Sequence, residues 1–168
     1  SDRDPLKISD PDINLRLQAM AKQHPSCKNI NQQSKELQRR LKIKAGAYST
    51  DSAGELLAMA FVDRIAQLNN NAQQSYRLSN GKGAQLRDQG HLSDSPFLVI
   101  ADMQGDQRQG NIYLAATVDI QALQNQQPAL FVQQEYLGWD DNKGQVIGEE
   151  RLLLGKLVID KKPLKQLG

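Results

Sequence analysis

The spacing of apolar residues changes once along the chain, from a helical period in its first part to a period of two in its later part. The first part predicts three helices. One covers residues 10–23 with Asp10 as its cap, and a second begins after Pro25 and ends before Gly46. The third covers residues 51–68 and is apolar around most of its circumference, which is typical of a helix buried among other elements.

From residue 75 onward the sequence predicts β-strands. Tyr76 and Leu78 alternate with polar neighbours, and further strand candidates follow at residues 96–102, 111–119, 129–139 and 145–160. Residues 120–127 have the pattern of a short helix that stops before Pro128.

These elements predict an α+β fold, because a run of helices is followed by a run of strands. The first predicted subdomain, residues 1–68, is an N-terminal helical region of about three helices. The second, residues 69–168, is an OB-like small antiparallel β-barrel of about five or six strands with one short helix. A helix between the third and fourth predicted strands is the order expected of an OB-fold.

The stretch SNGKG, which follows the first predicted strand, has two interpretations. Two glycines flanking a lysine suggest a phosphate-binding loop, but neither Gly-Lys pair of the chain is followed by the Ser or Thr that such a loop requires. The favoured interpretation is a tight hairpin with a type I′ turn at Asn80 and Gly81. Its arms turn Tyr76 and Leu78 inward, and Lys82 projects from the tip, where it can contact a phosphate.

Net charge, cysteine content and the length of apolar runs exclude some functional classes and leave nucleic-acid binding open. The 21 basic and 19 acidic residues give a net charge of +2, so bulk charge does not decide whether the chain binds nucleic acid. The single Cys27 excludes an internal disulfide and a cysteine-based zinc site. No apolar run reaches the length of a membrane span, so we expect no membrane partner and a cytoplasmic location. The chain starts without methionine, which suggests a fragment of a longer protein.

We expect no catalytic and no metal-binding residues in this segment. His24 and His91 lie far apart in the sequence, without carboxylates at ligand spacing. Cys27 lies among apolar helix positions, where a core role is favoured over that of a nucleophile. The stretch from Asp140 to Gly144 is similar to a calcium loop, but its glycine is misplaced and the terminal glutamate is missing, so a turn is predicted.

One basic cluster stands out, in the stretch KELQRRLKIK of the second predicted helix. Lys35, Arg39, Arg40 and Lys42 place positive charge along this helix, and such a stripe can follow a phosphate backbone. A solvated surface is the alternative, since charged helix faces are common. Tyr113 lies out of phase with the inward residues of its strand. It is either a stacking platform for a base or a cross-strand packing residue.

An ordered series of motifs points to one family. LLAMAFVDRIAQ is followed by YRLSNGKGAQL, PFLVIADMQGD and NIYLAATVD, and later by GWDDNKGQVIGEERLLLGKLVIDKKPL. This series resembles the bacterial DEAH-type ATP-dependent helicases of the HrpB family over roughly residues 50–165, and residues 10–45 fit the helicase-associated helical region. Val62, Phe97 and Lys82 depart from the family's usual proline, tryptophan and arginine. A lysine at this last position lacks the bidentate phosphate contact of arginine.

The resemblance implies that the chain follows two RecA-like motor domains in a larger protein. It would span part of the helicase-associated helical region and an OB-like domain. Neither a Walker motif nor a DEAH box is present, so ATP hydrolysis is not expected of this segment alone. ATP and Mg²⁺ would be cofactors of the parent helicase, and none is expected here. The expected partners are single-stranded RNA or DNA and the RecA-like domains of the same parent chain.

The resulting hypothesis is an accessory, non-catalytic region of an ATP-dependent RNA helicase that binds and positions single-stranded nucleic acid beside the motor domains. Its candidate binding residues are Lys35, Arg39, Arg40, Lys42, Arg64, Arg77, Lys82 and Arg87. Arg64 has a structural alternative, in which it pairs with Asp63 or another acid and locks the third helix against the barrel. The alternative function is a protein–protein docking module of the helicase with little RNA affinity, which the near-neutral net charge favours.

Overall fold

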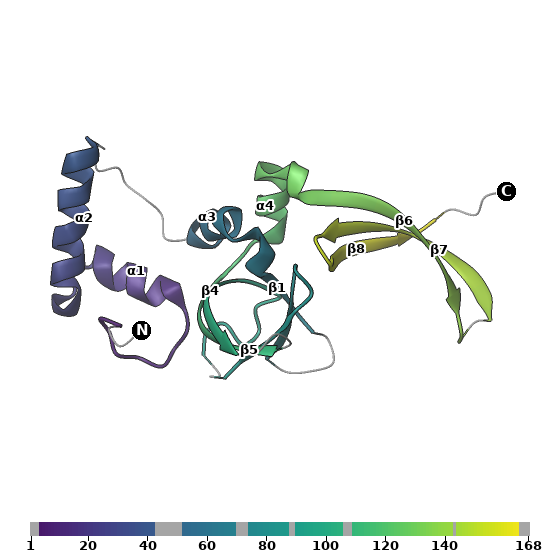
Figure 1. Ribbon diagram of the computed structural model, residues 1–168, viewed down its shortest axis with the longest axis horizontal. Coiled ribbons are helices and arrows are strands. Elements are labelled where there is room, and N and C mark those ends of the chain that lie inside the picture. Colours follow the sequence, from purple (N-terminus) through teal and green to yellow (C-terminus); the bar gives the residue numbers. More distant parts are fainter. Residues whose placement is uncertain are drawn as a thin grey trace.

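The computed structural model describes residues 4–42, 52–69, 74–87, 90–105, 109–142 and 144–164. These residues form an extended molecule of three parts: N-terminal helices, a barrel in the middle and a sheet that projects beyond it (Figure 1). The helices are α1 (Ile13–Ala21), α2 (Lys28–Leu41), α3 (Ala53–Ala60) and α4 (Ile120–Gln126). Single 3-10 turns lie at Pro25–Cys27, Val62–Arg64 and Pro128–Leu130. None of the helices in the described part of the chain is long and apolar enough to cross a membrane.

The five strands of the middle part close into a barrel, which confirms the OB-like prediction. They are β1 (Ile65–Leu68), β2 (Ser75–Leu78), β3 (Gly83–Leu86), β4 (Phe97–Gly105) and β5 (Gln109–Thr117). Their order is β1-β2-β3-β5-β4, and β4 closes the ring by pairing with β1. The barrel is mixed rather than purely antiparallel, since β3 and β5 run parallel. Closure requires this, because a ring of five strands cannot alternate in direction throughout, and the other four neighbouring pairs are antiparallel.

The β2–β3 hairpin has the predicted alternation of inward and outward side chains. Tyr76, Leu78, Ala84 and Leu86 are buried in the barrel core. Arg77, between the first two, is exposed. The hairpin interpretation of SNGKG is therefore confirmed.

The turn of this hairpin is not the predicted type I′, which needs positive φ at two residues. Gly81 has a φ of 91°, but Asn80 is not among the described non-glycine residues with positive φ. The Gly81 N–H donates to the Leu78 carbonyl and the Leu78 N–H donates to the Lys82 carbonyl, both at 2.8 Å. This is the pattern of a type I turn followed by a left-handed glycine. Asn80 contributes its side chain instead, since its Oδ1 accepts from the Lys82 N–H at 2.9 Å.

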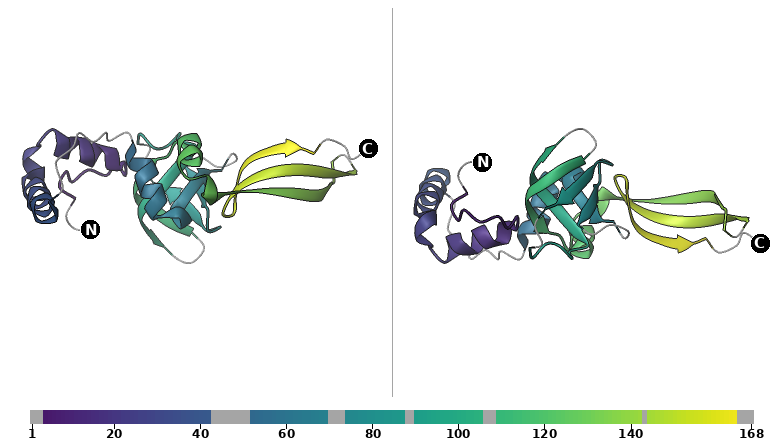
Figure 2. Two further views of the ribbon diagram at one scale, coloured as in Figure 1. Left: turned by 90° about the horizontal axis from the view of Figure 1, so that it is seen from above. Right: turned by 90° about the horizontal axis from the view of Figure 1, so that it is seen from below.

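The last three strands form a sheet of their own, with the order β6-β7-β8. Their bounds are β6 (Phe131–Asp140), β7 (Gln145–Leu154) and β8 (Leu157–Pro163). Figure 2 shows this sheet leaving the barrel as a long ribbon. The barrel closes without these strands, and α4 follows its fifth strand instead of lying between the third and fourth. The alternating pattern could not reveal this, because strands of either sheet have the same period. The domain boundaries 1–68 and 69–168 stay a prediction, although the pairing places β1 in the barrel.

A second hydrophobic cluster joins this sheet to the barrel. Leu154 and Leu157, at the β7–β8 turn, are 0% and 1% exposed. They belong to a cluster with Ala58 of α3 and Val99 of β4. The near end of the projecting sheet is therefore fixed to the barrel and to α3.

The third predicted helix, residues 51–68, is shorter in the structure. Helix α3 ends at Ala60, a 3-10 turn follows, and residues 65–68 form β1. Ile65 and Ala66 point to opposite sides of this strand, yet both are fully buried because β1 separates the barrel core from the second cluster. A segment that is apolar on all sides fits a buried helix and a doubly buried strand equally well. Residues 65–68 form a strand because they pair with β2 and β4 and so close the barrel.

The N-terminal segment attaches to the barrel beside β5. The Ala115 N–H of β5 donates to the Pro11 carbonyl at 2.9 Å, beyond the point where β3 stops pairing with β5. Asp12, and not the predicted Asp10, caps α1, since its Oδ1 accepts from the Asn14 N–H at 2.9 Å. This segment therefore extends the barrel sheet and leads directly into the first helix.

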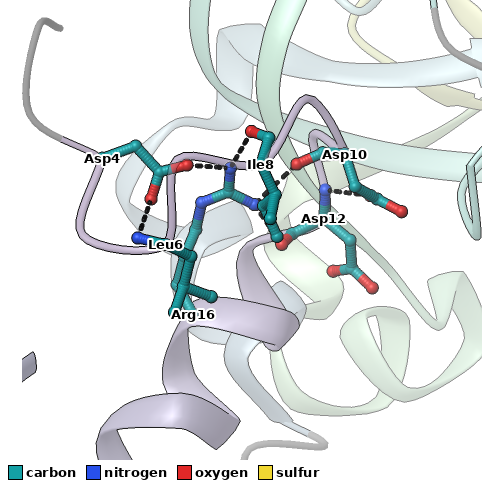
Figure 3. A network of polar contacts seen from close by, with 6 residues as sticks. All are labelled: Asp4, Leu6, Ile8, Asp10, Asp12 and Arg16. Carbon is teal, nitrogen blue, oxygen red and sulfur yellow. Dashed lines mark hydrogen bonds and ion pairs between the residues drawn. The ribbon is translucent and has the colours of Figure 1, made fainter. Parts of the chain in front are cut away.

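Arg16 of α1 organises the chain that precedes the helix (Figure 3). Its Nη1 donates to the carbonyls of Asp10 and Asp12 at 2.6 and 2.8 Å, and its Nη2 lies 2.6 Å from Asp4 Oδ2. The side chain is only 14% exposed. The fixed fork of N–H groups on a guanidinium suits donation to several acceptors at once, so Arg16 folds residues 4–12 back against the start of α1.

Candidate nucleic-acid interface

The basic side of α2 is exposed, as the sequence pattern predicts. Arg39 and Arg40 have side chains 79% and 72% exposed, and both approach Glu36 Oε1, at 3.5 and 2.9 Å. Lys35 is exposed on the same helix, and Lys42 ends it in a left-handed conformation with a φ of 54°. Exposed ion pairs on a helix contribute only a few tenths of a kcal/mol, so a phosphate can replace Glu36 as the partner of either arginine. Binding of nucleic acid by this helix stays a prediction.

Arg64 has the contacts of a structural residue. Its Nη1 donates to the Ala101 carbonyl of β4 at 3.1 Å, and its guanidinium lies 5.4 Å from the centre of the Phe61 ring. Among the described residues, a backbone carbonyl therefore takes the place of the expected acidic partner. Arg64 ties the turn after α3 to the barrel, which is the structural alternative that the sequence left open.

The remaining predicted cations divide between the two ends of the β2–β3 hairpin. Arg77 and Lys82 are exposed near the turn. Arg87 follows β3 at the other end, where its Nε donates to Asn111 Oδ1 at 3.0 Å. Helix α2 lies at the opposite end of the molecule from the projecting sheet (Figure 1). The structure thus brings Arg77 and Lys82 together but separates them from Arg87 and from the α2 cations.

A groove of about 520 Å³ lies between the β1–β2 side of the barrel and the β7–β8 hairpin. Its lining contains Arg77 and three cations that the sequence analysis missed, namely Arg151, Lys156 and Lys161. Asp160 is the one carboxylate among these described lining residues. The barrel cation and the sheet cations are far apart in sequence, so no local motif could join them. Only the packing of the hairpin against the barrel does so.

Two hydrogen bonds fix the two walls of this groove relative to each other. The Lys156 N–H donates to the Ser79 carbonyl at 2.8 Å, and Gln67 Nε2 donates to the Val158 carbonyl at 3.2 Å. Gly155 permits the first contact, because it has a φ of 56° and a Cβ there would lie 2.5 Å from the Ser79 carbonyl oxygen. The groove is therefore preformed.

The cations of the groove differ in how strongly they are held. The Arg151 Nε donates to Glu149 Oε2 at 2.9 Å, and the guanidinium lies 3.5 Å from the centre of the Tyr136 ring. Lys161 Nζ lies 3.8 Å from Glu149 Oε1. Arg77 and Lys156 have no ion-pair partner within the described ranges of the chain.

Other candidate residues have simple environments. Cys27 is fully buried, as its place among apolar helix positions predicts, and Tyr113 on β5 is 44% exposed. The His24 ring accepts from the Ser26 N–H at 3.3 Å and so caps a 3-10 turn. Within the part of the chain that the structure describes, no three His, Cys, Asp or Glu side chains form a group that could hold a metal ion.

Comparisons of sequence with known proteins agree with one another. Residues 130–164, which include β6, β7 and β8, match the family model described as "ATP-dependent RNA helicase HrpB, connector region". The ATP-dependent RNA helicase HrpB of Escherichia coli strain K12 is 35% identical over 138 residues, which are 79% of this chain and 17% of that protein.

Comparisons of structure give the same result. A crystal structure of the E. coli DExH-box NTPase HrpB matches with a TM-score of 0.78 and 30% identity, over 96% of this chain and 19% of that one. A crystal structure of the E. coli DEAH/RHA helicase HrpB matches with a TM-score of 0.76 and 27% identity, over the same shares. The chain therefore spans less than a fifth of the length of these relatives.

Proposed function

Because this chain belongs to the HrpB family of ATP-dependent RNA helicases, as a segment of less than a fifth of their length, we propose that it is an accessory, non-catalytic region that holds single-stranded nucleic acid beside the motor domains. The observation that carries the proposal is the closed β1-β2-β3-β5-β4 barrel. Five-stranded barrels of the OB type are recurrent platforms for oligonucleotides. The proposal includes a cytoplasmic location.

The proposed mechanism is electrostatic positioning. Exposed cations on α2 and on the β2–β3 turn neutralise phosphates and release the counterions of the strand. No covalent step falls to this segment. We place the use of ATP and Mg²⁺ in the rest of the parent chain, because this sequence has no Gly-Lys-Ser or Gly-Lys-Thr loop.

The test is fluorescence anisotropy of labelled single-stranded RNA with the 168-residue chain, at several salt concentrations. We expect affinity to fall steeply with salt, by about 0.7 in log K per unit of log salt for each phosphate contact. Arg39→Gln combined with Arg40→Gln should reduce this slope. Lys7→Gln combined with Lys22→Gln removes the same charge from exposed positions outside the candidate residues and should not. Absence of binding at low salt would contradict the proposal.

A second candidate function is a docking module for the motor domains, and a different observation favours it. Leu137, Trp139 and Val146, near the far end of the β6–β7 hairpin, are 70%, 61% and 66% exposed. Trp139 and Val146 are directly paired across the two strands, so they form part of one apolar patch. Exposed apolar patches of this kind are typical of interaction surfaces.

A further inference from the structure

The groove between the barrel and the β7–β8 hairpin has a cation on each wall, and we propose that it binds the phosphate backbone of single-stranded nucleic acid. This inference rests on the proposed function for the class of ligand, and it adds the place of binding. Arg77 stands on the barrel wall and Lys156 on the wall formed by the sheet. The binding site is thus shared between the barrel and the β7–β8 hairpin.

The shape of the groove suits a short flexible strand. Its volume of about 520 Å³ lies within the range of about 300–1,000 Å³ of ordinary ligand sites, which admits a few groups of a single strand. The contact between Lys156 N–H and the Ser79 carbonyl holds the walls in place before any ligand arrives. A preformed site loses less conformational entropy on binding.

The charge of the groove is available to a ligand at two positions. Glu149 already engages Arg151 and Lys161, so these two cations are partly neutralised. The lining carboxylate, Asp160, has a side chain 57% exposed and lies 3.7 Å from Lys162 Nζ. Of the four cations in the described lining, Arg77 and Lys156 are therefore the two without an ion-pair partner. One uncompensated cation on each wall matches the repeated negative charge of a phosphodiester backbone.

The remaining lining predicts how such a strand is recognised. Leu68, Leu157 and Ile159 form an apolar part of the surface, and Gln67 and Asn69 add amide groups. No aromatic side chain belongs to the described lining. Stacking on aromatic rings usually adds about 1–3 kcal/mol per base to the binding free energy. Without it, binding in this groove depends on contacts with the phosphate backbone of the nucleic acid. We expect weak preference for base sequence and strong dependence on salt.

The experiment compares two charge-matched double variants in the salt-dependent anisotropy assay with a labelled, unstructured RNA oligonucleotide. Arg77→Gln with Lys156→Gln removes the two free cations, and Lys7→Gln with Lys22→Gln is the control. Loss of two contacts should lower the salt slope by about 1.4, at about 0.7 per phosphate, and weaken binding about tenfold at low salt. The control should keep the wild-type slope. Arg77→Lys, which retains the charge, should keep most of it too.

The outcomes separate this inference from the function on which it rests. Wild-type binding with an unchanged slope in the groove variant overturns the groove and leaves the proposed function standing. No binding by the wild-type chain ends both. Displacement of the RNA by polyglutamate at equal charge concentration overturns the assignment to nucleic acid, because an acidic peptide would then satisfy the same cations. Arg77 and Lys156 are exposed, and circular dichroism of each variant verifies that the fold is retained.

Discussion

At the scale of single residues, Tyr76 joins the barrel core to the loop before β4. It has the largest fully buried side chain of the described residues, and its hydroxyl donates to the carbonyls of Leu92 and Ser95, at 3.0 and 3.1 Å. Burial, and then the charge of Asp94, raise the pKa of Tyr76 from 10.0 to about 12. The stabilisation that depends on the neutral phenol is complete below pH 10 and is lost as the pH rises toward 12.

Tyr76→Phe keeps the buried ring and removes only the hydroxyl. We expect the free energy of unfolding to fall by about 1–2 kcal/mol, because the buried Leu92 carbonyl and the partly buried Ser95 carbonyl lose the hydroxyl donor that they share. Urea denaturation at neutral pH measures this change. Tyr113→Phe is the control, since that ring is 44% exposed on β5 and should change stability little. Equal losses in both variants would show that the buried hydroxyl is not the cause.

Asp10 and His91 form a second residue-scale contact, 3.1 Å between Oδ2 and Nδ1. Burial opposes ionisation of Asp10, but the Asp12 N–H and His91 outweigh it and hold the pKa of Asp10 below its ordinary value. The hydrogen bond and the charge of Asp10 raise the pKa of His91. The pair therefore stabilises the fold at mildly acidic pH. Its contribution is lost as the pH falls through the lowered pKa of Asp10 or rises through the raised pKa of His91.

Asp10→Asn keeps an oxygen that can accept from the Asp12 N–H and removes the charge that faces His91. We expect the pKa of His91, followed by NMR titration of its imidazole protons, to fall toward the ordinary value of 6.5. Asp4→Asn is the control, because Asp4 pairs with Arg16 and not with His91. An unchanged His91 titration in the Asp10 variant would mean that the contact is not formed in solution.

At the scale of elements, the β7–β8 turn decides how the projecting sheet is attached. Gly155 has a φ of 56°, and a Cβ there would meet the Ser79 carbonyl oxygen at 2.5 Å. Gly144, in the β6–β7 turn, has a φ of 59° and nothing within 4 Å of a Cβ. The two glycines share the conformational penalty for an L side chain, and only Gly155 adds a backbone clash.

Gly155→Ala should therefore destabilise the protein more than Gly144→Ala. We expect about 1 kcal/mol for Gly144→Ala from the left-handed conformation alone, and about 2–3 kcal/mol for Gly155→Ala, because strain and clash combine. Thermal unfolding of both variants makes the comparison, and hydrogen exchange at the Lys156 amide reports the contact with Ser79. Equal losses would show that this contact does not hold the sheet to the barrel.

Elements with one buried face were the ones that the sequence predicted well. The alternation of Tyr76 and Leu78 predicted an inward-facing strand, and the glycine of SNGKG marked its hairpin. The turn type escaped prediction because Asn80 satisfies the Lys82 amide through its side chain at negative φ. Residues 65–68 were predicted as helix because a strand buried on both sides has no alternation to reveal it.

At the scale of the whole molecule, the proximity of some residues of the candidate site could be predicted from the sequence, and that of others could not. The proximity of Arg39 and Arg40 could be predicted, because they are neighbours on one helix. The proximity of Lys156 to the barrel could not, because it depends on which strands close the ring and which remain outside. The spacing of residues in the sequence predicts contacts within one element. It does not predict the groove, because the groove forms where two separate sheets pack together.

The projecting sheet gives the whole molecule two faces that can be tested separately for docking. Trp139 is the single tryptophan of the sequence and is 61% exposed, so labelling with 5-fluorotryptophan yields one ¹⁹F signal. If this patch docks on the motor domains, adding the unlabelled remainder of the parent helicase should shift the signal. The signal should also respond less to exchange of H₂O for D₂O, because the indole loses contact with water.

Two lysine substitutions on β6 and β7 distinguish the proposed docking face from the opposite face of the sheet. Val146 pairs with Trp139 and shares its face, whereas Val132, seven residues before Trp139 on the same strand, lies on the opposite face by the two-residue period. Both valines are exposed, at 66% and 58%, so neither substitution disturbs a core. Val146→Lys should abolish the ¹⁹F shift, because it buries a charge in an apolar contact, while Val132→Lys should preserve it. A signal that does not respond to the parent chain, or that both variants alter equally, would leave the exposed patch without the proposed partner.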